Sequence, residues 1–205
     1  MIGWHRAGFA LYWKWLSRHR EVIVAMDFFT VPTATFRVLY VWFAVRHSRR
    51  DIAHWSVTDS PTAPWVVQQL REAYPFNDAG DLSRYLVFDR DTIFSADVTA
   101  AIASIGLKPT RTSYQSPWQN GVAERFVGTV RRGLLDHAIV LDDEHLRRLL
   151  GEYLAYYHAD RTHLGIEKDA PVRRPAELRP EASSAVRARR RVGGLYHRYE
   201  WAATA

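Results

Sequence analysis

Short hydrophobic runs of strand length dominate the first half of the chain. The apolar, β-branched run over residues 21–30, EVIVAMDFFT, is followed by Pro32, and its continuous hydrophobicity predicts a strand covered on both faces. Runs over residues 36–45 and 52–57 follow after short polar breaks that suit antiparallel pairing. A fourth apolar run, YLVF, covers residues 85–88. The pattern therefore predicts three neighbouring antiparallel strands, then a separate fourth strand.

Helical spacing appears between and after the later strands. Residues 60–74 predict a helix with Thr62 as its N-cap, and a second helix is expected near residues 97–105. The next strand, near residues 107–112, contains Pro109, which cannot donate a ladder hydrogen bond and so indicates a sheet edge. Three antiparallel strands followed by alternating helices and strands predict an α/β fold, a five-stranded mixed sheet flanked by helices. That is the order of the ribonuclease H-like fold.

Two further helices are expected beyond the sheet. Ser116 and Gln119, with Pro117 between them, predict a capping box that opens a helix running to about residue 137. Apolar residues keep unbroken helical spacing over residues 144–157.

Composition removes several classes of chemistry. The chain has 205 residues, is 47% hydrophobic and contains no cysteine, which excludes disulfides, thiol nucleophiles and cysteine-type zinc sites. The nine histidines show no metal-ligand spacing. No run is long and apolar enough to span a membrane, and the cationic opening segment is unlike a signal peptide, so a cytoplasmic protein is expected.

The net charge of +6 is unevenly distributed. The basic, aromatic N-terminal segment, residues 1–20, carries +4, and the Pro- and Arg-rich C-terminal arm, residues 161–205, carries +5. The predicted core between them, residues 21–160, carries −3. We expect the C-terminal arm to be extended or disordered, with residues 187–191 and the N-terminal segment contacting phosphates. Arms that serve only solubility remain the alternative.

Three acidic residues stand at positions that need an explanation. Asp27 interrupts the most buried predicted strand, where an unpaired carboxylate is costly, so it needs a cation partner, a raised pKa or a metal. Asp89 comes directly after the YLVF strand, and Glu124 lies on the outward face of the helix opened by Ser116. A strand-end aspartate, a turn aspartate and a surface glutamate are the alternatives.

The segments around these acids carry a family resemblance. VIVAMDFFT, LVFDRDTIF and SPWQNGVAERFVGTVRR resemble the three motifs of retroviral-type integrase cores and of bacterial insertion-sequence transposases of the Asp-Asp-Glu class. Asp89 and Glu124 enclose 34 residues, close to the spacing of the last two acids in that family. EYLAYYHADRTHLG resembles the Tyr-rich stretch that follows those cores, so the resemblance covers residues 21 to about 175.

The resemblance implies a metal-dependent reaction on double-stranded DNA. Asp27, Asp89 and Glu124 fall on the family's metal-binding acids, which would hold two Mg²⁺ or Mn²⁺ ions for donor-end cleavage and strand transfer in DNA recombination and integration. Paired DNA ends imply a homodimer or higher homo-oligomer, associated with the bacterial nucleoid. Asp91 is a rival to Asp89 that we expect to support the loop instead.

Polar residues around Glu124 are expected to orient the acid or to contact DNA. This group comprises Gln119, Asn120, Arg125, Arg131 and Arg132. Trp118 is expected to pack within the fold.

The short segment before the first strand departs from the family, whose transposases carry a helix-turn-helix region there. A truncated copy, a core that works with a separate DNA-binding protein, or a remnant are each consistent with it. A catalytically silent DNA-binding module and a ribonuclease H-like nuclease also remain open.

Overall fold

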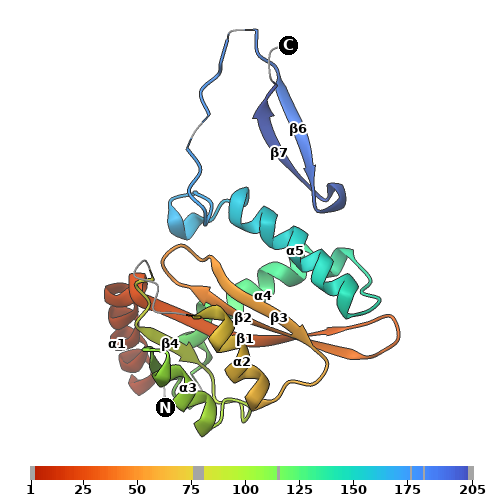
Figure 1. Cartoon of the computed structure of the whole chain (residues 1–205). Coiled ribbons are helices and arrows are strands. Elements are labelled where there is room, and N and C mark those ends of the chain that lie inside the picture. The colour runs from red at the N-terminus through yellow and green to blue at the C-terminus, as the bar shows by residue number, and fades with distance from the viewer. Residues whose placement is uncertain (1–2, 76–80, 115, 176, 182, 203–205) are drawn as a thin grey trace. The chain divides into compact units, whose positions relative to one another are not determined.

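The computed structural model describes residues 3–75, 81–114, 116–175, 177–181 and 183–202 (Figure 1). The chain divides into two compact units, Met1–Asp143 and Glu144–Ala205. The division falls earlier than the boundary expected at residue 160, because the helix after residue 143 belongs to the second unit.

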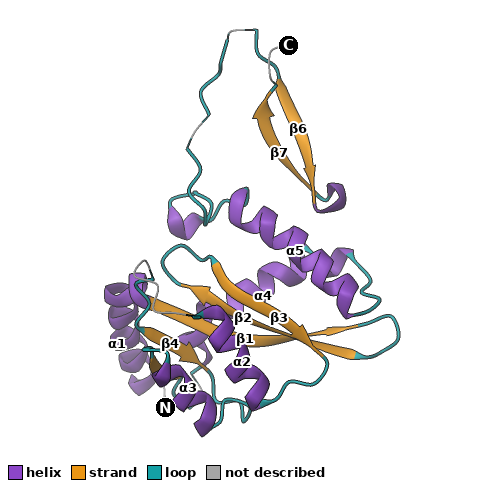
Figure 2. Ribbon diagram, viewed as in Figure 1, coloured by secondary structure: helices purple, strands orange, loops and turns teal. Residues whose placement is uncertain are grey.

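A five-stranded mixed sheet forms the centre of the first unit (Figure 2). Its order is β3-β2-β1-β4-β5, with β1, β2 and β3 antiparallel and with β4 and β5 parallel to β1. The α/β prediction with three antiparallel strands first is confirmed, and β5, which contains Pro109, lies at the edge as expected. The strands are β1 (Ile23–Pro32), β2 (Val38–Arg46), β3 (Ile52–Thr58), β4 (Tyr85–Phe88) and β5 (Lys108–Arg111).

The helices of the first unit largely follow the sequence pattern. Thr62 caps α2 by accepting a hydrogen bond from the Trp65 backbone N–H at 3.3 Å, as predicted. Ser95 caps α3 in the same way. The α-helices are α1 (Gly3–His19), α2 (Ala63–Ala73), α3 (Ala96–Ser104) and α4 (Gly121–Gly133), and the 3₁₀ turns are η1 (Arg20–Val22), η2 (Pro117–Asn120) and η3 (Leu135–His137).

The predicted capping box at Ser116 is wrong. The Ser116 hydroxyl donates to the Tyr114 carbonyl at 3.3 Å and makes no cap bond. The segment after it is therefore the 3₁₀ turn η2, and α4 begins only at Gly121 and ends at Gly133. Because η2 has about three residues per turn instead of 3.6, the side chains of the residues before Glu124 point in other directions than they would in an α-helix.

The two faces of the sheet are covered by different helices. Alternate residues of β1, such as Val24 and Met26, belong to the hydrophobic core under α2 and α3. The opposite face packs against α4, where the rings of Phe43 and Phe126 lie 4.6 Å apart between centroids. Fully buried members of the α2/α3 core also include Trp42, Leu70, Leu86, Phe88, Phe94, Val98 and Ile102.

The second unit corrects the expectation of an extended or disordered arm. Residues 186–201 form an antiparallel hairpin in which β6 pairs with β7 along its whole length. The ring of Tyr196 stacks on Tyr156 of α5 at 4.2 Å between centroids, and Arg191 Nε binds Asp160 Oδ2 at 2.8 Å. These long-range contacts give the segment an ordered structure that its composition did not indicate. The elements are α5 (Asp143–Ala159), η4 (Leu164–Ile166), β6 (Val186–Arg191), η5 (Val192–Gly194) and β7 (Tyr196–Trp201).

Among the described residues, no helix has both the length and the apolar character needed to cross a membrane.

Candidate active site

Asp27 lies in the middle of the central strand β1, in a half-buried position. Its Oδ1 accepts a hydrogen bond from the Phe28 backbone N–H at 2.8 Å, and its Oδ2 accepts one from Asn120 Nδ2 at 3.2 Å. Both carboxylate oxygens are therefore held in place by donors, and the side chain has a defined orientation.

The electrostatics of Asp27 reveal its neighbours. Burial raises the pKa of the Asp27 carboxyl to about 7, and the Phe28 hydrogen bond opposes that rise. Repulsion by Asp89, Glu124 and Asp91 raises the pKa further. Three other acids thus lie close enough to destabilise the ionised form of Asp27, so this end of the sheet gathers negative charge.

Strand register explains why Asp89 lies near Asp27. In the parallel pairing of β1 with β4, Ala25 stands beside Val87. Asp27 and Asp89 each follow that pair by two residues, with Asp89 just beyond the end of β4, so both acids lie near the same end of this strand pair. The Asp89 Oδ1 accepts the Asp91 backbone N–H at 3.0 Å, so the turn after β4 is held by the acid itself.

Glu124 reaches the same face from α4. Ala123, Phe126 and Val130 are buried, whereas Glu124 is exposed in the first turn of the helix. These three residues and Leu134 form the buried stripe that faces the sheet, while Val122 is only half-buried. The first turn of a helix favours a negative charge, which makes this position suitable for a carboxylate.

Asn120 connects the start of α4 to the central strand. Its side chain is only 3% exposed, and Nδ2 lies 3.4 Å from the Met26 carbonyl as well as 3.2 Å from Asp27 Oδ2. A carbonyl oxygen can only accept, so the Met26 contact fixes Nδ2 as the atom that faces Asp27. Of the two roles expected for Asn120, this burial favours orienting the acid over contacting DNA.

No pattern in the sequence indicated that α1 supports η2, the turn before α4. The Tyr12 hydroxyl donates to the Gln119 carbonyl at 2.5 Å, and the rings of Phe9 and Trp118 meet edge to face at 6.4 Å. Burial raises the pKa of Tyr12 to about 12, so its hydroxyl stays protonated and able to donate. Trp118 packs as expected. The aromatic residues of the N-terminal segment, interpreted as part of a phosphate-binding arm, include groups that pack this helix against η2.

Gln119 holds the loop that precedes η2. Its Oε1 accepts the Ser113 backbone N–H at 2.5 Å, and its Nε2 donates to the Ser113 hydroxyl at 3.3 Å. Both polar ends of the amide are thus bonded to Ser113, which ties η2 to that residue.

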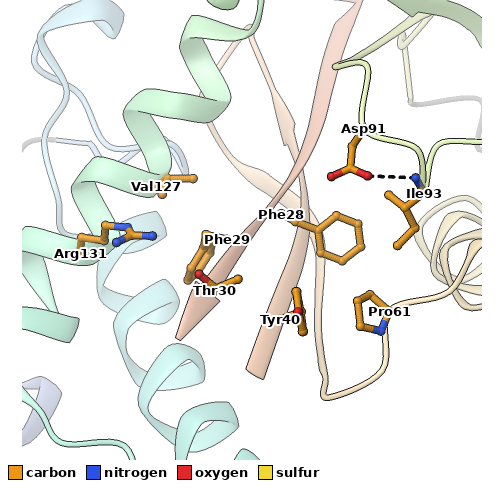
Figure 3. A pocket seen from close by; sticks show the side chains of 9 residues that line it. All are labelled: Phe28, Phe29, Thr30, Tyr40, Pro61, Asp91, Ile93, Val127 and Arg131. Carbon is orange, nitrogen blue, oxygen red and sulfur yellow. Dashed lines mark hydrogen bonds between the residues drawn. The ribbon is translucent and has the colours of Figure 1, made fainter. Parts of the chain in front are cut away.

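A groove of about 440 Å³ is lined by Asp91 and by Phe28, the residue after Asp27 (Figure 3). Phe28 and Asp91 line it from the sheet side, and Val127 and Arg131 line it from α4. Its walls are mainly apolar and aromatic, with one carboxylate and one guanidinium. The aromatic walls can accept a flat organic group, and the guanidinium of Arg131 can accept a neighbouring anionic group. The other lining residues are Phe29, Thr30, Tyr40, Pro61 and Ile93.

The expected DNA-contacting arginines lie exposed along α4. Arg125, Arg131 and Arg132 are all accessible. Arg132 bends back over Gly128, where its guanidinium nitrogens lie 3.1 Å from the position that a Cβ would occupy. A side chain at position 128 would therefore have to displace Arg132.

The donor set suits a hard divalent cation, because it consists of carboxylate oxygens. Within the described residues, however, no three His, Cys, Asp or Glu side chains are already gathered into a group that could hold a metal ion.

Comparison with known proteins places this geometry in context. Residues 105–171 match the family model described as an integrase core domain. The putative transposase InsD for insertion element IS2E of Escherichia coli (strain K12) is 28% identical over 138 residues, covering 65% of this chain and 63% of that protein. Further InsD transposases match at the same identity over 46% of their length. The chain thus spans about half to somewhat under two thirds of these relatives.

Solved structures show the same fold at low sequence identity. The catalytic core domain of BIV integrase has a TM-score of 0.53 and 18% identity, covering 74% of this chain and 91% of that one. The Mos1 transposase catalytic domain, solved with raltegravir and Mn, has a TM-score of 0.58 and 14% identity, covering 70% and 78%. The chain is thus similar in sequence to the InsD transposases and, over residues 105–171, to the integrase core model, and its fold is similar to those of integrase and transposase catalytic domains.

Proposed function

We propose that this chain is a transposase catalytic core that carries out metal-dependent phosphoryl transfer on double-stranded DNA, by donor-end cleavage and strand transfer. Asp27, Asp89 and Glu124 would hold two Mg²⁺ or Mn²⁺ ions. The observation that supports this most directly is Asp27, a carboxylate in the central strand with a pKa raised to about 7 by burial and by repulsion from acids that include the other two. Such an arrangement is costly unless a cation offsets it.

The proposed cations would give the mutually repelling acids a shared role. When bound, two divalent ions would activate the attacking oxygen and neutralise the leaving oxygen of an in-line displacement at phosphorus. A cation would also lower the pKa of Asp27 and draw together carboxylates that otherwise repel one another. Among the similar folds, the Mos1 transposase catalytic domain has been solved with Mn.

The chain's own residues would provide position and charge. Asn120 and the Phe28 backbone N–H hold the Asp27 carboxylate in one orientation, so it meets the cation without rearrangement. Arg125, Arg131 and Arg132 are accessible on α4 and would neutralise DNA phosphates beside the acids. We further propose that the groove lined by Phe28 and Arg131 accepts part of the DNA next to the reacting phosphate.

A strand-transfer assay tests the proposal. With Mn²⁺, a pre-cut double-stranded DNA end and a target duplex, the wild-type chain should give joined product. Asp27→Asn, Asp89→Asn and Glu124→Gln should each abolish joining while the circular dichroism spectrum stays unchanged. Asp97→Asn, a matched change at an exposed acid in the first turn of α3, should retain activity.

The same assay separates the alternatives. Cleavage without joining would identify a nuclease, and neither product would identify a silent DNA-binding module. Retained joining by any one of the three acid variants would remove that residue from the site.

We also propose at least a homodimer on DNA, because two element ends must be joined together. A single protomer per joined complex in mass photometry would contradict this.

A further inference from the structure

The turn that closes the β1–β2 hairpin exposes an aromatic side chain (Figure 1). Phe36 is 91% exposed and has a positive backbone φ of 61°, a conformation that bulky residues seldom adopt. The Thr33 N–H donates to the Arg37 carbonyl at 2.8 Å, and the Thr33 hydroxyl oxygen accepts the Arg37 N–H at 3.1 Å. The Phe36 N–H donates to the Thr33 carbonyl at 2.9 Å. These bonds fix the backbone of Phe36 while its ring stays exposed to solvent.

A second segment adds apolar side chains beside this turn. The Ala34 N–H donates to the Val140 carbonyl at 2.7 Å, which brings residues 139–141 alongside the turn. Val140 is buried, whereas its neighbours Ile139, 75% exposed, and Leu141 face the solvent, as in an extended segment whose side chains alternate. We call the resulting surface the turn patch, which consists of Phe36, Val38, Ile139 and Leu141.

The turn patch is large for a surface that meets only water. Its four exposed side chains present on the order of 500 Å² of apolar area, comparable to the largest patch on a typical soluble monomer, and patches of that size mark interaction sites. A standard protein–protein interface buries about 800 Å² on each partner, with an apolar core inside a polar rim. The turn patch therefore has the size of the core of such an interface.

The charges beside the patch favour a protein partner over DNA. Arg37, next to Phe36, pairs with Asp59 at 2.7 Å, and both side chains are exposed. Asp142 follows Leu141 and is also exposed. One guanidinium and two carboxylates give this edge a net negative charge, which opposes a phosphate backbone. Because the edge contains both signs, the same surface of a second copy can complement it.

We propose that the turn patch is the surface through which two copies of this chain form a two-fold dimer, with Phe36 and Ile139 in the apolar core of the interface and Arg37 at its rim. Both copies use the same surface in a two-fold contact, so a patch that is apolar at its centre and carries both signs at its edge complements itself. The need for two protomers rests on the function proposed above, whereas the choice of this surface rests on its exposure, area and charge.

Sedimentation velocity of the full chain tests the surface without DNA or catalysis. In EDTA, over a series of protein concentrations, the wild type should show a concentration-dependent dimer. Phe36→Asn combined with Ile139→Thr should weaken dimerisation at least tenfold. Asn tolerates the left-handed backbone and Thr keeps the β-branching, so the fold should be retained. Leu164→Asn combined with Leu178→Thr removes two exposed leucines of the second unit and should dimerise like the wild type.

Chemical cross-linking locates the interface directly, because the chain contains no native cysteine. Ile139→Cys treated with a short bismaleimide should give a covalent dimer on a denaturing gel, since a two-fold contact through the turn patch brings position 139 of both copies close together. Leu164→Cys, which places the thiol at another highly exposed position, should remain mostly monomeric under the same conditions.

The outcomes separate this proposal from its rivals. Unchanged dimerisation in the patch variant, an equal loss in the leucine control, equal cross-linking at both cysteine positions or a wild type that stays monomeric would each overturn it. A patch variant that dimerises normally but loses duplex binding in fluorescence anisotropy would assign the patch to DNA instead. Asp27→Asn should dimerise like the wild type while failing in strand transfer, so failure of the catalytic proposal is recognised independently.

Discussion

The side-chain amide of Asn120, at the end of η2, donates a hydrogen bond to Oδ2 of Asp27 in the central strand at 3.2 Å. The two residues lie 93 positions apart in the chain. The contact joins the turn before α4 to Asp27, whose pKa burial raises to about 7, so changes in that turn should be felt at this carboxylate.

Asn120→Ala should shift the pH dependence of strand transfer. A hydrogen bond to the charged form of a carboxylate favours that form, so losing the amide should raise the pKa of Asp27 above its value of about 7. Because the ionised form binds cations, activity should fall more at pH 6.5 than at pH 8.5. Gln119→Ala is the control, because among the described residues this amide bonds only to Ser113. It should leave the fall in strand-transfer activity at low pH where it is in the wild type. Coincident profiles for Asn120→Ala and the wild type would contradict the proposed role.

Asp27→Asn should change how stability depends on pH. The folded-state pKa of about 7 lies above the ordinary value of 3.8, so ionising Asp27 opposes folding, and the wild type loses stability as pH rises through that window. The loss should be on the order of 2 kcal/mol after solvent screening. Thermal unfolding in EDTA at pH 5 and pH 8 should therefore show a larger decline for the wild type than for Asp27→Asn. Comparing slopes cancels the pH-independent effects of the substitution.

Divalent cations extend that measurement. Mg²⁺ should raise the melting temperature of the wild type at pH 8, because it binds the folded acid cluster and offsets its repulsion. Asp27→Asn should respond much less. An equal rise in both proteins would place the stabilising cation elsewhere.

Asp89→Asn and Asp91→Asn should separate the two candidate acids after β4. Asp91 Oδ1 is engaged by the Ile93 backbone N–H at 2.9 Å, which suits a residue that shapes the turn. Asp89→Asn should abolish strand transfer, whereas Asp91→Asn should retain a measurable rate. The reverse order of activities would transfer the proposed metal-binding role to Asp91.

Tyr12→Phe should loosen η2 without changing the acids. It removes one hydroxyl, whose bond to the Gln119 carbonyl should be worth about 1 kcal/mol. Hydrogen exchange at the Gln119 and Asn120 amides should become faster, and strand transfer should slow. Tyr114→Phe makes the same chemical change at a residue that is 71% exposed and should alter neither.

Asp160→Asn should release the C-terminal hairpin. The change leaves half-buried Arg191 and Arg198 without their shared carboxylate. The free energy of unfolding should fall by about 2 kcal/mol. This loss is smaller than for a fully buried ion pair because the arginine side chains are 24–25% exposed. Amides of β6 and β7 should lose protection from hydrogen exchange while those of β1 stay protected. Glu177→Gln, at a more exposed acid, should have a smaller effect.

Local pattern alone was enough for most elements of the sheet. The four-residue run YLVF became β4 with the predicted bounds, and Pro109 marked the edge strand, because burial on both faces and a missing donor are properties of the segment itself. The same runs located Asp27 within one strand and Asp89 just after another, whereas the pairing of β1 with β4 came from the tertiary structure. The capping box at Ser116 failed because the side chain of Gln119, which would have to reach back to the Ser116 backbone, bonds to Ser113 instead.

The sequence by itself thus determined the order of strands and helices and the resemblance that singles out Asp27, Asp89 and Glu124. Only the tertiary structure decided that α1 supports the turn through Tyr12, that Asn120 is buried against Asp27, and that the basic arm folds into a hairpin anchored on Asp160. The reason is physical. Hydrophobic periodicity indicates which face of a segment is buried. These three contacts instead join side chains that are 107, 93 and 31 residues apart in the chain, and no local pattern specifies the partner at such distances.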